Sequence, residues 1–247
     1  MKPIAIIPAR FASTRLPGKP LIPIGGEPMI VRVWNNVIQS NLFSRVIVAT
    51  DFQEIKDVVE SSGGEAIMTS ECHENGTDRI LEVVENCGLE NEIIVNVQGD
   101  EPFLSHEILK DVVELLKNPN FQIATAAEPI HEEDAYLNSN SVKVVMDQTQ
   151  RAMYFSRSPI PCYREGNYPQ NRLAWKHLGI YGFRPGVFRK LAQLTPTDLE
   201  KAEKLEQLRW LEHGFSIGVA TPNSTFSIAI DTPEDLIKAE LHWRSLQ

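Results

Sequence analysis

Residues Ile4-Ala-Ile-Ile-Pro-Ala-Arg-Phe-Ala-Ser-Thr-Arg-Leu-Pro-Gly-Lys19 join an apolar run to a loop that carries three cations. The run, closed by Pro8, is typical of a buried strand that ends in a loop. The loop then places Arg10, Arg15 and Lys19 at the carboxyl end of the strand, the edge at which open α/β sheets bind ligands. Guanidinium groups offer planar forked donors and an ammonium offers a compact charge, so the cluster favours a polyphosphate ligand. An exposed basic loop without a ligand is the alternative.

The charge of the rest of the chain argues against several classes of partner. Of 247 residues, 33 are acidic and 24 are basic, which gives a formal net charge of -9. Binding to a nucleic acid backbone needs a broad basic surface, and binding to an anionic membrane needs a polybasic patch. The hydrophobic fraction of 42% is enough for a full core. No apolar stretch approaches the roughly 18 to 20 residues that span a bilayer.

Cysteine usage and the N-terminus favour a cytoplasmic protein. Cys72, Cys87 and Cys162 are odd in number and widely spaced, which fits neither a disulfide framework nor a zinc site. His73-Glu74 lacks the second histidine of a zincin. The chain begins a strand almost at once, so we expect no signal peptide and a reducing compartment.

The first hundred residues alternate short apolar runs with segments of helical spacing. Strands are expected at 4–7, 45–50, 65–70 and 92–97, and helices around 30–37, 55–59 and 80–87. Gly63-Gly64 would end the second helix. This alternation predicts βαβ units and a parallel sheet. Because crossovers are right-handed, the expected fold class is α/β, with a doubly wound, mostly parallel, Rossmann-like sheet.

Beyond residue 120 the pattern changes. Strands are expected at 142–146, 152–155, 176–183 and 226–230, with a helix over 199–208 that ends near Gly214 and a closing helix after 231. Residues 158–169 are rich in Pro and predict a long loop. Since no linker is visible, we expect a single domain over 1–247. Within it, 1–120 would form the α/β core, 121–220 a smaller mixed β/α part, and 221–247 a return to the core.

Two aspartates stand at expected strand ends. Asp100 follows the apolar run 92–97, and it is not needed to cap the next helix because Ser105 can do so. Asp231 precedes Thr232-Pro233, a strong helix-start signature. Because Thr232 can cap this helix alone, Asp231 is not needed as a cap. Two carboxylates together with substrate phosphates form the kind of oxygen-rich site that holds Mg²⁺.

Several well-known motifs are missing from the sequence. Gly18-Lys19-Pro20 lacks both the earlier glycine and the Ser/Thr of a P-loop. No G-x-G-x-x-G follows a strand, which argues against a nicotinamide cofactor. No G-x-S-x-G nucleophile elbow is present.

Residues 8–21 resemble the signature loop of the sugar nucleotidyltransferases that make CMP-activated sugars. The similarity continues in order through 48–51, 76–79, 96–102, 154–161, 177–181, 205–209 and 231–235. The series spans nearly the whole chain and is similar to the branch that activates 3-deoxy-manno-octulosonate (Kdo). The chain departs from the pattern at Phe11, where many members have Tyr.

The resemblance implies a nucleotidyltransferase fold and Mg²⁺-dependent transfer of CMP from CTP to the anomeric hydroxyl of Kdo, giving CMP-Kdo and pyrophosphate for lipopolysaccharide biosynthesis. It also implies that 1–120 mainly binds CTP and that 121–220 mainly binds the sugar and forms a homodimer. Loop 162–172 matches no usable pattern, so 8-amino-Kdo or a sialic acid remains open as the acceptor. A non-catalytic nucleotide-binding protein on this fold is the alternative from another functional class.

Roles are carried over where the motifs match. The catalytic residues would be Arg10, Lys19, Asp100 and Asp231, with the two aspartates as Mg²⁺ ligands. The nucleotide would be bound by Pro8, Ala9, Arg10, Ser13, Arg15, Lys19, Thr69, Ser70, Gly76, Thr77 and Arg79. The sugar would be bound by Gln98, Arg157, His177, Tyr181, Glu206 and Gln207.

Elementary chemistry agrees with this division. Nucleotidyl transfer needs positioning and charge neutralisation more than a covalent intermediate. A guanidinium such as that of Arg157 suits the Kdo carboxylate, and mixed donors and acceptors suit its hydroxyls. Structural alternatives stay open for three residues: Tyr181 as core, Glu206 as a solvated helix face, and His177 as a buried structural histidine.

Overall fold

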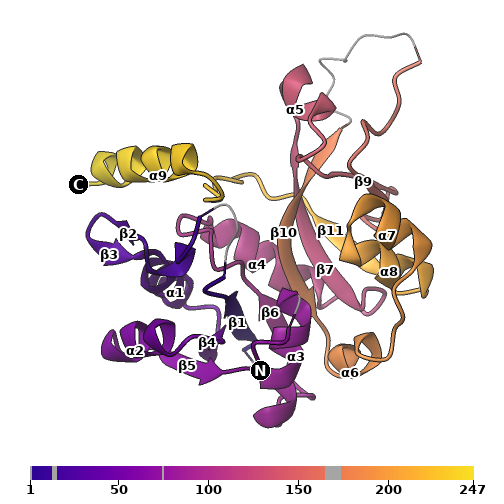
Figure 1. The fold of residues 1–247 in the computed structure, drawn as a ribbon. Coiled ribbons are helices and arrows are strands. Elements are labelled where there is room, and N and C mark those ends of the chain that lie inside the picture. The colour runs from indigo at the N-terminus through magenta and orange to yellow at the C-terminus, as the bar shows by residue number, and fades with distance from the viewer. Residues whose placement is uncertain (1, 13–15, 74, 165–173) are drawn as a thin grey trace. The chain divides into compact units, whose positions relative to one another are not determined.

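The computed structural model describes residues 2–12, 16–73, 75–164 and 174–247 (Figure 1). Contacts divide the chain into two compact units: unit 1 comprises Met1–Leu109 and Ser224–Gln247, and unit 2 comprises Lys110–Asn223. The first boundary falls earlier in the chain than the expected 120, and the second falls slightly later than the expected 220. The division of labour between the two parts stays a prediction.

Unit 1 is built on a parallel sheet in the order β6-β1-β4-β5. Its strands are β1 (Ile4–Ala9), β4 (Arg45–Thr50), β5 (Glu65–Met68) and β6 (Ile94–Asn96). The chain moves outward from β1 to β4 and β5, and then returns to place β6 on the other side of β1. Strand order therefore reverses at β1, and ligands of doubly wound sheets bind at the carboxyl ends of strands at such a point.

The helices of unit 1 follow the apolar spacing of the sequence. They are α1 (Met29–Gln39), α2 (Gln53–Ser61), α3 (Gly76–Asn86), the start of α4 (His106–Leu115) and α9 (Pro233–Ser245). A short 3-10 helix η1 (Lys19–Leu21) leads into a small hairpin of β2 (Pro23–Ile24) and β3 (Glu27–Pro28). Ile30, Val33 and Val37 of α1 are buried, as predicted. Gly63 adopts φ 83° just after α2, which confirms the predicted helix end.

Unit 2 contains a mixed sheet. Its strands are β7 (Ile123–Pro129), β8 (Lys143–Met146), β9 (Ala152–Ser156), β10 (Trp175–Phe183) and β11 (Ile217–Ala220). Its short helices are α5 (Glu133–Leu137), α6 (Val187–Leu191), α7 (Asp198–Glu203) and α8 (Glu206–Glu212). β7 pairs antiparallel with β10 and parallel with β11, while β8 pairs antiparallel with both β10 and β9. The predicted α/β class with a smaller mixed part is thus confirmed.

The structure corrects the predicted helix over 199–208. Lys204 adopts a left-handed conformation, with φ 54° and ψ 47°, which ends α7. α8 then starts at Glu206, so the predicted helix is two short ones. In the sequence, the apolar residues recur at helical spacing through the break, so periodicity alone did not reveal it. In the structure, Leu205 and Leu208 are buried, whereas no residue of α7 is.

The predicted strand over 226–230 is also wrong. This segment bonds to a loop instead of a strand: the Ser105 N–H donates to the Phe226 carbonyl, and the Ile230 N–H donates to the Asp100 carbonyl, each at 3.0 Å. β7, β11, α5, α6 and the β2–β3 hairpin were not predicted. Within the described residues, no helix has the length and apolar character needed to cross a bilayer.

Candidate active site

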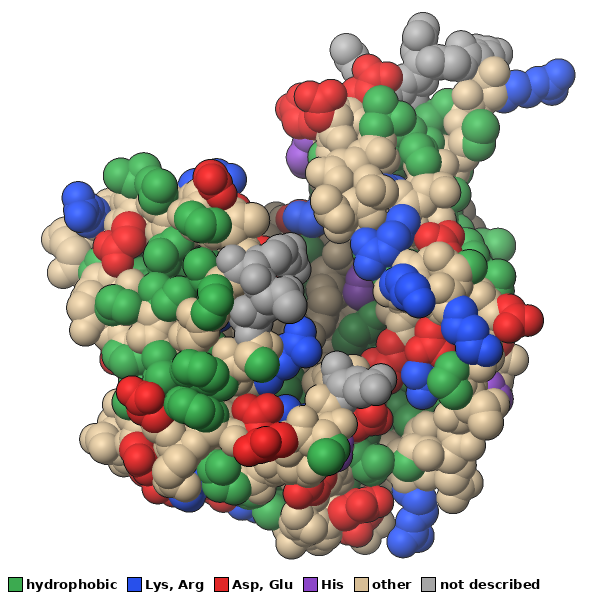
Figure 2. All heavy atoms as spheres, in the orientation of Figure 1, with side chains coloured by type: hydrophobic (Ala, Val, Ile, Leu, Met, Phe, Trp, Pro, Cys, Tyr) green, Lys and Arg blue, Asp and Glu red, His purple; other side chains and the backbone are tan. Residues whose placement is uncertain are grey.

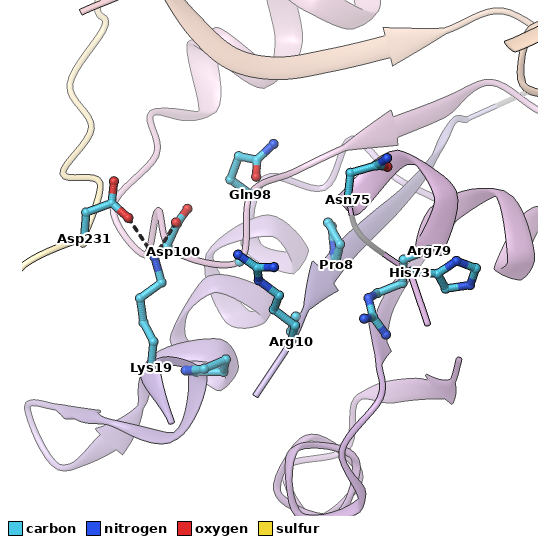
Figure 3. A pocket seen from close by; sticks show the side chains of 13 residues that line it. Pro8, Arg10, Lys19, His73, Asn75, Arg79, Gln98, Asp100 and Asp231 are labelled. Atoms are coloured by element: carbon cyan, nitrogen blue, oxygen red, sulfur yellow. Dashed lines mark hydrogen bonds and ion pairs between the residues drawn. The ribbon is translucent and has the colours of Figure 1, made fainter. Parts of the chain in front are cut away.

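A cavity of about 420 Å³ opens in unit 1 at the carboxyl ends of β1 and β6 (Figure 3). Much of its lining comes from the loops and helix ends that follow β1, β5 and β6. The lining residues are Pro8, Ala9, Arg10, Lys19, Pro20, His73, Asn75, Gly76, Arg79, Gln98, Gly99, Asp100 and Asp231. The cavity therefore brings together residues that lie far apart in the chain and that the sequence assigned to phosphate and metal binding: Arg10, Lys19, Asp100 and Asp231.

Lys19 lies between the two aspartates. Its Nζ atom donates to Asp100 Oδ2 at 2.6 Å, to Asp231 Oδ1 at 3.1 Å and to the Ile230 carbonyl at 2.9 Å. These three bonds equal the three hydrogens of an ammonium group. The Lys19 side chain is 15% exposed, so this charge is partly withdrawn from water.

The two aspartates fit a divalent cation. One ammonium contacts both carboxylates, so a single small cation could reach an oxygen of each. No group of three or more His, Cys, Asp or Glu side chains in the described part of the chain could hold a metal. Mg²⁺ is commonly held by one or two carboxylates and completed by substrate phosphates, so the donor set present suits Mg²⁺ bound together with a triphosphate.

Arg10 and Gln98 face the same cavity from neighbouring strand ends. Figure 3 shows the Arg10 guanidinium pointing into the space between Asp100 and Pro8, with Gln98 above it. Gly99 allows the chain after β6 to lie close to the end of β1, because an added Cβ would lie 2.8 Å from the Pro8 carbonyl oxygen. The approach of β6 to β1 therefore depends on a residue without a side chain.

Arg79 is buried, with only 2% of its surface exposed. Its guanidinium donates to Asp51 Oδ2 at 2.7 Å and to Thr69 Oγ1 at 2.5 Å, with a longer bond to the Ser70 carbonyl. Asp51 Oδ1 in turn accepts the Phe11 N–H at 3.3 Å. Arg79 thus ties α3 to the ends of β4 and β5, and through Asp51 to the loop after β1. The structure places Thr69 and Arg79 in one network, with Ser70 joined to it through its backbone carbonyl.

The N-terminus of α3 forms another wall of the cavity. The Asn75 side chain caps the helix by accepting the Asp78 N–H at 2.8 Å. Gly76 lies against Pro8, since an added Cβ would come within 3.2 Å of the Pro8 ring. Thr77 is buried one residue further along. Backbone N–H groups at a helix start favour negative charge, which suits a phosphate-binding wall.

Sequence reasoning missed His73 and Glu82. Glu82 Oε2 accepts the Ser70 N–H at 2.9 Å and contacts His73 Nε2 at 2.5 Å. Glu82 therefore fixes the 70–73 turn, which lines the cavity through His73, onto α3. The only available signal was the spacing of Arg79 and Glu82, which puts both on one face of a helix.

In unit 2, His177 and Tyr181 lie together on β10. Their rings are 5.3 Å apart, and a register shift between Leu178 and Tyr181 interrupts the pairing with β7. Such irregularities re-aim side chains. His177 Nε2 is 2.9 Å from Thr125 Oγ1, and burial lowers the pKa of His177 to about 3, which keeps its ring neutral.

Tyr181 is nearly buried and packs edge-on against Trp210 at 5.0 Å. Burial raises the pKa of Tyr181 well above its ordinary value, and the charge of Glu206 adds to the effect. The hydroxyl therefore stays protonated and able to donate. Glu206 at the start of α8 is close enough to act on this tyrosine, while the neighbouring Gln207 is buried at 6% exposure.

Arg157 is heavily engaged with the backbone of unit 2. Its guanidinium donates to the carbonyls of Glu203 at 2.7 Å, Ser139 at 3.1 Å and Lys204 at 3.4 Å. A guanidinium has five donors, so the remaining two could meet a carboxylate. Ser13 and Arg15, which the sequence assigned to the nucleotide, lie outside the described residues.

Comparisons with known proteins agree with this geometry. The family model described as cytidylyltransferase matches residues 4–217. A 3-deoxy-manno-octulosonate cytidylyltransferase of Parabacteroides distasonis is 44% identical over 246 residues, covering 97% of each chain. A solved structure of CMP:2-keto-3-deoxy-manno-octonic acid synthetase complexed with CTP is 36% identical, with a TM-score of 0.92 and full coverage of both chains. On the strength of the matched length and identity, this chain belongs to the cytidylyltransferase family.

Proposed function

We propose that this cytidylyltransferase transfers CMP from CTP to the anomeric 2-hydroxyl of Kdo in an Mg²⁺-dependent reaction. The product would be CMP-Kdo, the activated sugar for lipopolysaccharide biosynthesis, and pyrophosphate would leave. The observation that carries the proposal is the bridge from Lys19 to Asp100 and Asp231 in a cavity that also contains Arg10. Kdo and CTP are proposed as substrates because the names of the similar proteins include them.

In this reaction the sugar hydroxyl oxygen forms a bond to the α-phosphorus of CTP. The hydroxyl loses its proton, and the bond from the α-phosphorus to the bridging oxygen of pyrophosphate breaks. Negative charge grows on the leaving oxygens, so fixed cations near them lower the barrier. Arg10 and Lys19 are the cavity side chains that would supply this charge, because both face the space beside the carboxylates.

Asp100 and Asp231 would hold Mg²⁺, with phosphate oxygens completing its shell. When bound, the ion would neutralise phosphate charge and acidify a coordinated hydroxyl. Lys19 spends its three hydrogens on protein oxygens in this structure, so it must exchange at least one of these partners to donate to a phosphate.

Binding of the sugar is assigned to Gln98 and to residues of unit 2. The neutral ring of His177 and the protonated hydroxyl of Tyr181 provide an acceptor and a donor for sugar hydroxyls. Arg157 gives three of its five guanidinium hydrogens to carbonyls in the described residues, and we assign the other two to the Kdo carboxylate. We also propose a cytoplasmic homodimer, which rests on the sequence resemblance.

The test is pyrophosphate release from CTP with Mg²⁺ and Kdo, run beside 8-amino-Kdo, N-acetylneuraminate and a control without sugar. Release with Kdo alone is the expected result. Release with another sugar would keep the chemistry and change the acceptor, whereas no release with any sugar would leave a nucleotide-binding protein.

Asp100→Asn and Asp231→Asn are the decisive variants for the metal. Each should weaken Mg²⁺ activation, because one charged ligand is replaced by a neutral amide. Asp198→Asn is the matched control, since the Asp198 side chain is fully exposed at the start of α7. Equal activity of all three variants would contradict the metal site.

A further inference from the structure

Helix α9 follows directly after Asp231 but is held to unit 1 by few contacts. Of its 13 residues, only Ala239 is buried, while Ile237 and Leu241 are each 61% exposed. The position of such a helix cannot come from a broad apolar interface. It must depend on the small number of specific contacts that the helix does make.

Two neighbouring residues near the far end of α9 make these contacts. The His242 ring packs against those of Phe103 and Phe226, with centroids 4.8 Å and 4.5 Å apart. Trp243 stacks on the guanidinium of Arg32, whose Cζ atom is 3.7 Å from the ring centroid. Arg32 is itself 7% exposed and donates through Nε to the Ile24 carbonyl at 2.8 Å. A cation over an indole face that is withdrawn from water is a favourable contact. It fixes Trp243 to the β2–β3 hairpin.

Gly25, in the turn of the β2–β3 hairpin, contacts α9 beside Trp243. Its N–H donates to Glu240 Oε1 at 2.8 Å, one turn before Trp243. A Cβ on Gly25 would lie 2.0 Å from Trp243 Nε1, and Gly25 has a φ of 55°. Both the space and the backbone conformation therefore require glycine, because any side chain would push the indole away.

The near end of α9 is equally well defined. Thr232 and Asp235 form a reciprocal capping box, and Asp235 Oδ2 also accepts the Asp231 N–H at 3.3 Å. Asp231 is thus joined to the first turn of the helix, so movement of the helix moves its carboxylate. Lys19, the partner of Asp231, lies in η1, six residues before Gly25.

The segment from Lys19 to Gly25 and the segment from Asp231 to Trp243 therefore contact each other at both ends. At one end Lys19 meets Asp231, and at the other Gly25 meets Trp243 and Glu240. From Pro233 to Trp243 the helix spans about 15 Å at 1.5 Å per residue, and Asp231 lies two residues before it. A small tilt at the far end shifts the near end, and a 1 Å error in a catalytic group can cost about 100-fold in rate.

We infer that Trp243 and Glu240 are positioning residues that set the Asp231 carboxylate beside Lys19 by holding α9 on Gly25. This inference rests on the proposed function of Asp231 as a metal ligand. It goes beyond that function because it assigns the placement of the carboxylate to contacts remote from the cavity.

The test compares Gly25→Ala with Gly26→Ala. Both glycines have positive φ, 55° and 81°, but nothing lies within 4 Å of a Cβ on Gly26. The two variants therefore share the backbone strain, and only Gly25→Ala collides with Trp243. Trp243→Phe keeps an aromatic face for Arg32 and serves as the conservative variant for Trp243→Ala.

Two readouts are measured on the full chain: steady-state kcat and KM for CTP, and Mn²⁺ binding in the presence of CTP, followed by electron paramagnetic resonance. Gly25→Ala and Trp243→Ala should weaken Mn²⁺ binding by about 10-fold or more and lower kcat, as loss of ligand support does in metal sites. Gly26→Ala should keep wild-type binding, and Trp243→Phe should recover most of it. The thermal melting temperature is recorded for each variant so that unfolded protein is recognised.

Equal Mn²⁺ binding by Gly25→Ala and wild type, or equal losses in Gly25→Ala and Gly26→Ala, would overturn the inference. Asp231→Asn is measured beside them. If Asp231→Asn leaves Mn²⁺ binding unchanged, the proposed metal site fails. If Asp231→Asn weakens binding but Gly25→Ala does not, the metal site stands and only the positioning role fails. The binding readout needs no turnover, so it is independent of the identity of the sugar.

Discussion

The Lys19 ammonium lies 2.6 Å from the Asp100 carboxylate, 81 positions away in the sequence. Lys19 reaches this place from the 3-10 helix after the first loop, and Asp100 reaches it from the end of β6. The contact neutralises a carboxylate that would otherwise stand beside that of Asp231. This arrangement of one cation between two acidic groups is the basis of the metal and triphosphate site proposed above.

Replacing Lys19 should disable the cavity without unfolding the chain. In Lys19→Met the side chain stays unbranched and loses only its terminal ammonium, so the charge for the phosphates is lost. We expect kcat/KM for CTP to fall by about 10²- to 10³-fold, the usual loss for a group that stabilises charge in the transition state. Lys56→Met is the control, because Lys56 forms a surface pair with Glu60 on α2. Equal kinetics for both variants would contradict the assignment of Lys19.

Removing Asp51 should destabilise unit 1. Arg79 and Asp51 form a 2.7 Å ion pair whose side chains are 3% and 13% exposed. Asp51→Ala leaves the arginine charge buried and unpaired, so the free energy of unfolding should fall by about 3–5 kcal/mol. Urea denaturation measures this change. Glu65→Ala breaks the exposed Arg45–Glu65 pair and should cost less than about 1 kcal/mol; a similar loss in both variants would argue against the buried network.

His177 should make stability depend on pH. Its folded-state pKa is about 3, below an unfolded value of about 6.5, so protons bind preferentially to the unfolded chain between these values. Stability from this group is fully present above about pH 6.5 and decreases as the pH falls toward 3. Well below pH 6 the loss should approach about 1.4 kcal/mol per pH unit.

His177→Gln removes this proton site and is compared with wild type by urea denaturation at pH 7.0 and pH 5.0. The wild type should lose more stability than the variant over this interval. A parallel decrease for the two proteins would show that His177 is not held neutral by burial.

Glycine at the break between α7 and α8 should stabilise the protein. Lys204 has φ 54°, a conformation that costs energy for a residue with a Cβ. Lys204→Gly should raise the free energy of unfolding by about 0.5–1 kcal/mol, and Arg157 would keep its bond to the residue 204 carbonyl. Lys201→Gly lies inside α7 and should instead lower it by about 1 kcal/mol. Two changes of the same sign would show that the left-handed turn is not what ends the helix.

The sequence was enough for the parallel strands of unit 1 and for α1, α2 and α3, but it missed the β2–β3 hairpin and wrongly predicted a strand over 226–230. The parallel strands are continuous apolar runs because a parallel sheet is covered on both faces. The helices α1, α2 and α3 show helical spacing because each buries one face against the core. Local chemistry also predicted the start of α9, since Thr232 and Pro233 are sufficient to begin a helix whatever surrounds them. Unit 2 was predicted less well, because its short elements contain too few residues to show a period.

The candidate site divides in the same way. The sequence by itself predicted which side chains carry phosphate and metal chemistry. Lys19 begins η1, Asp100 follows β6 and Asp231 precedes α9, so all three lie beside elements that the local sequence defines. Only the tertiary structure decided that Lys19 contacts both carboxylates, that Glu82 fixes the turn before α3, and that α9 is held at its far end through Trp243. Each of these contacts joins residues that are distant in sequence or belong to different elements, and such contacts arise from packing in three dimensions, which leaves no periodic signal along the chain.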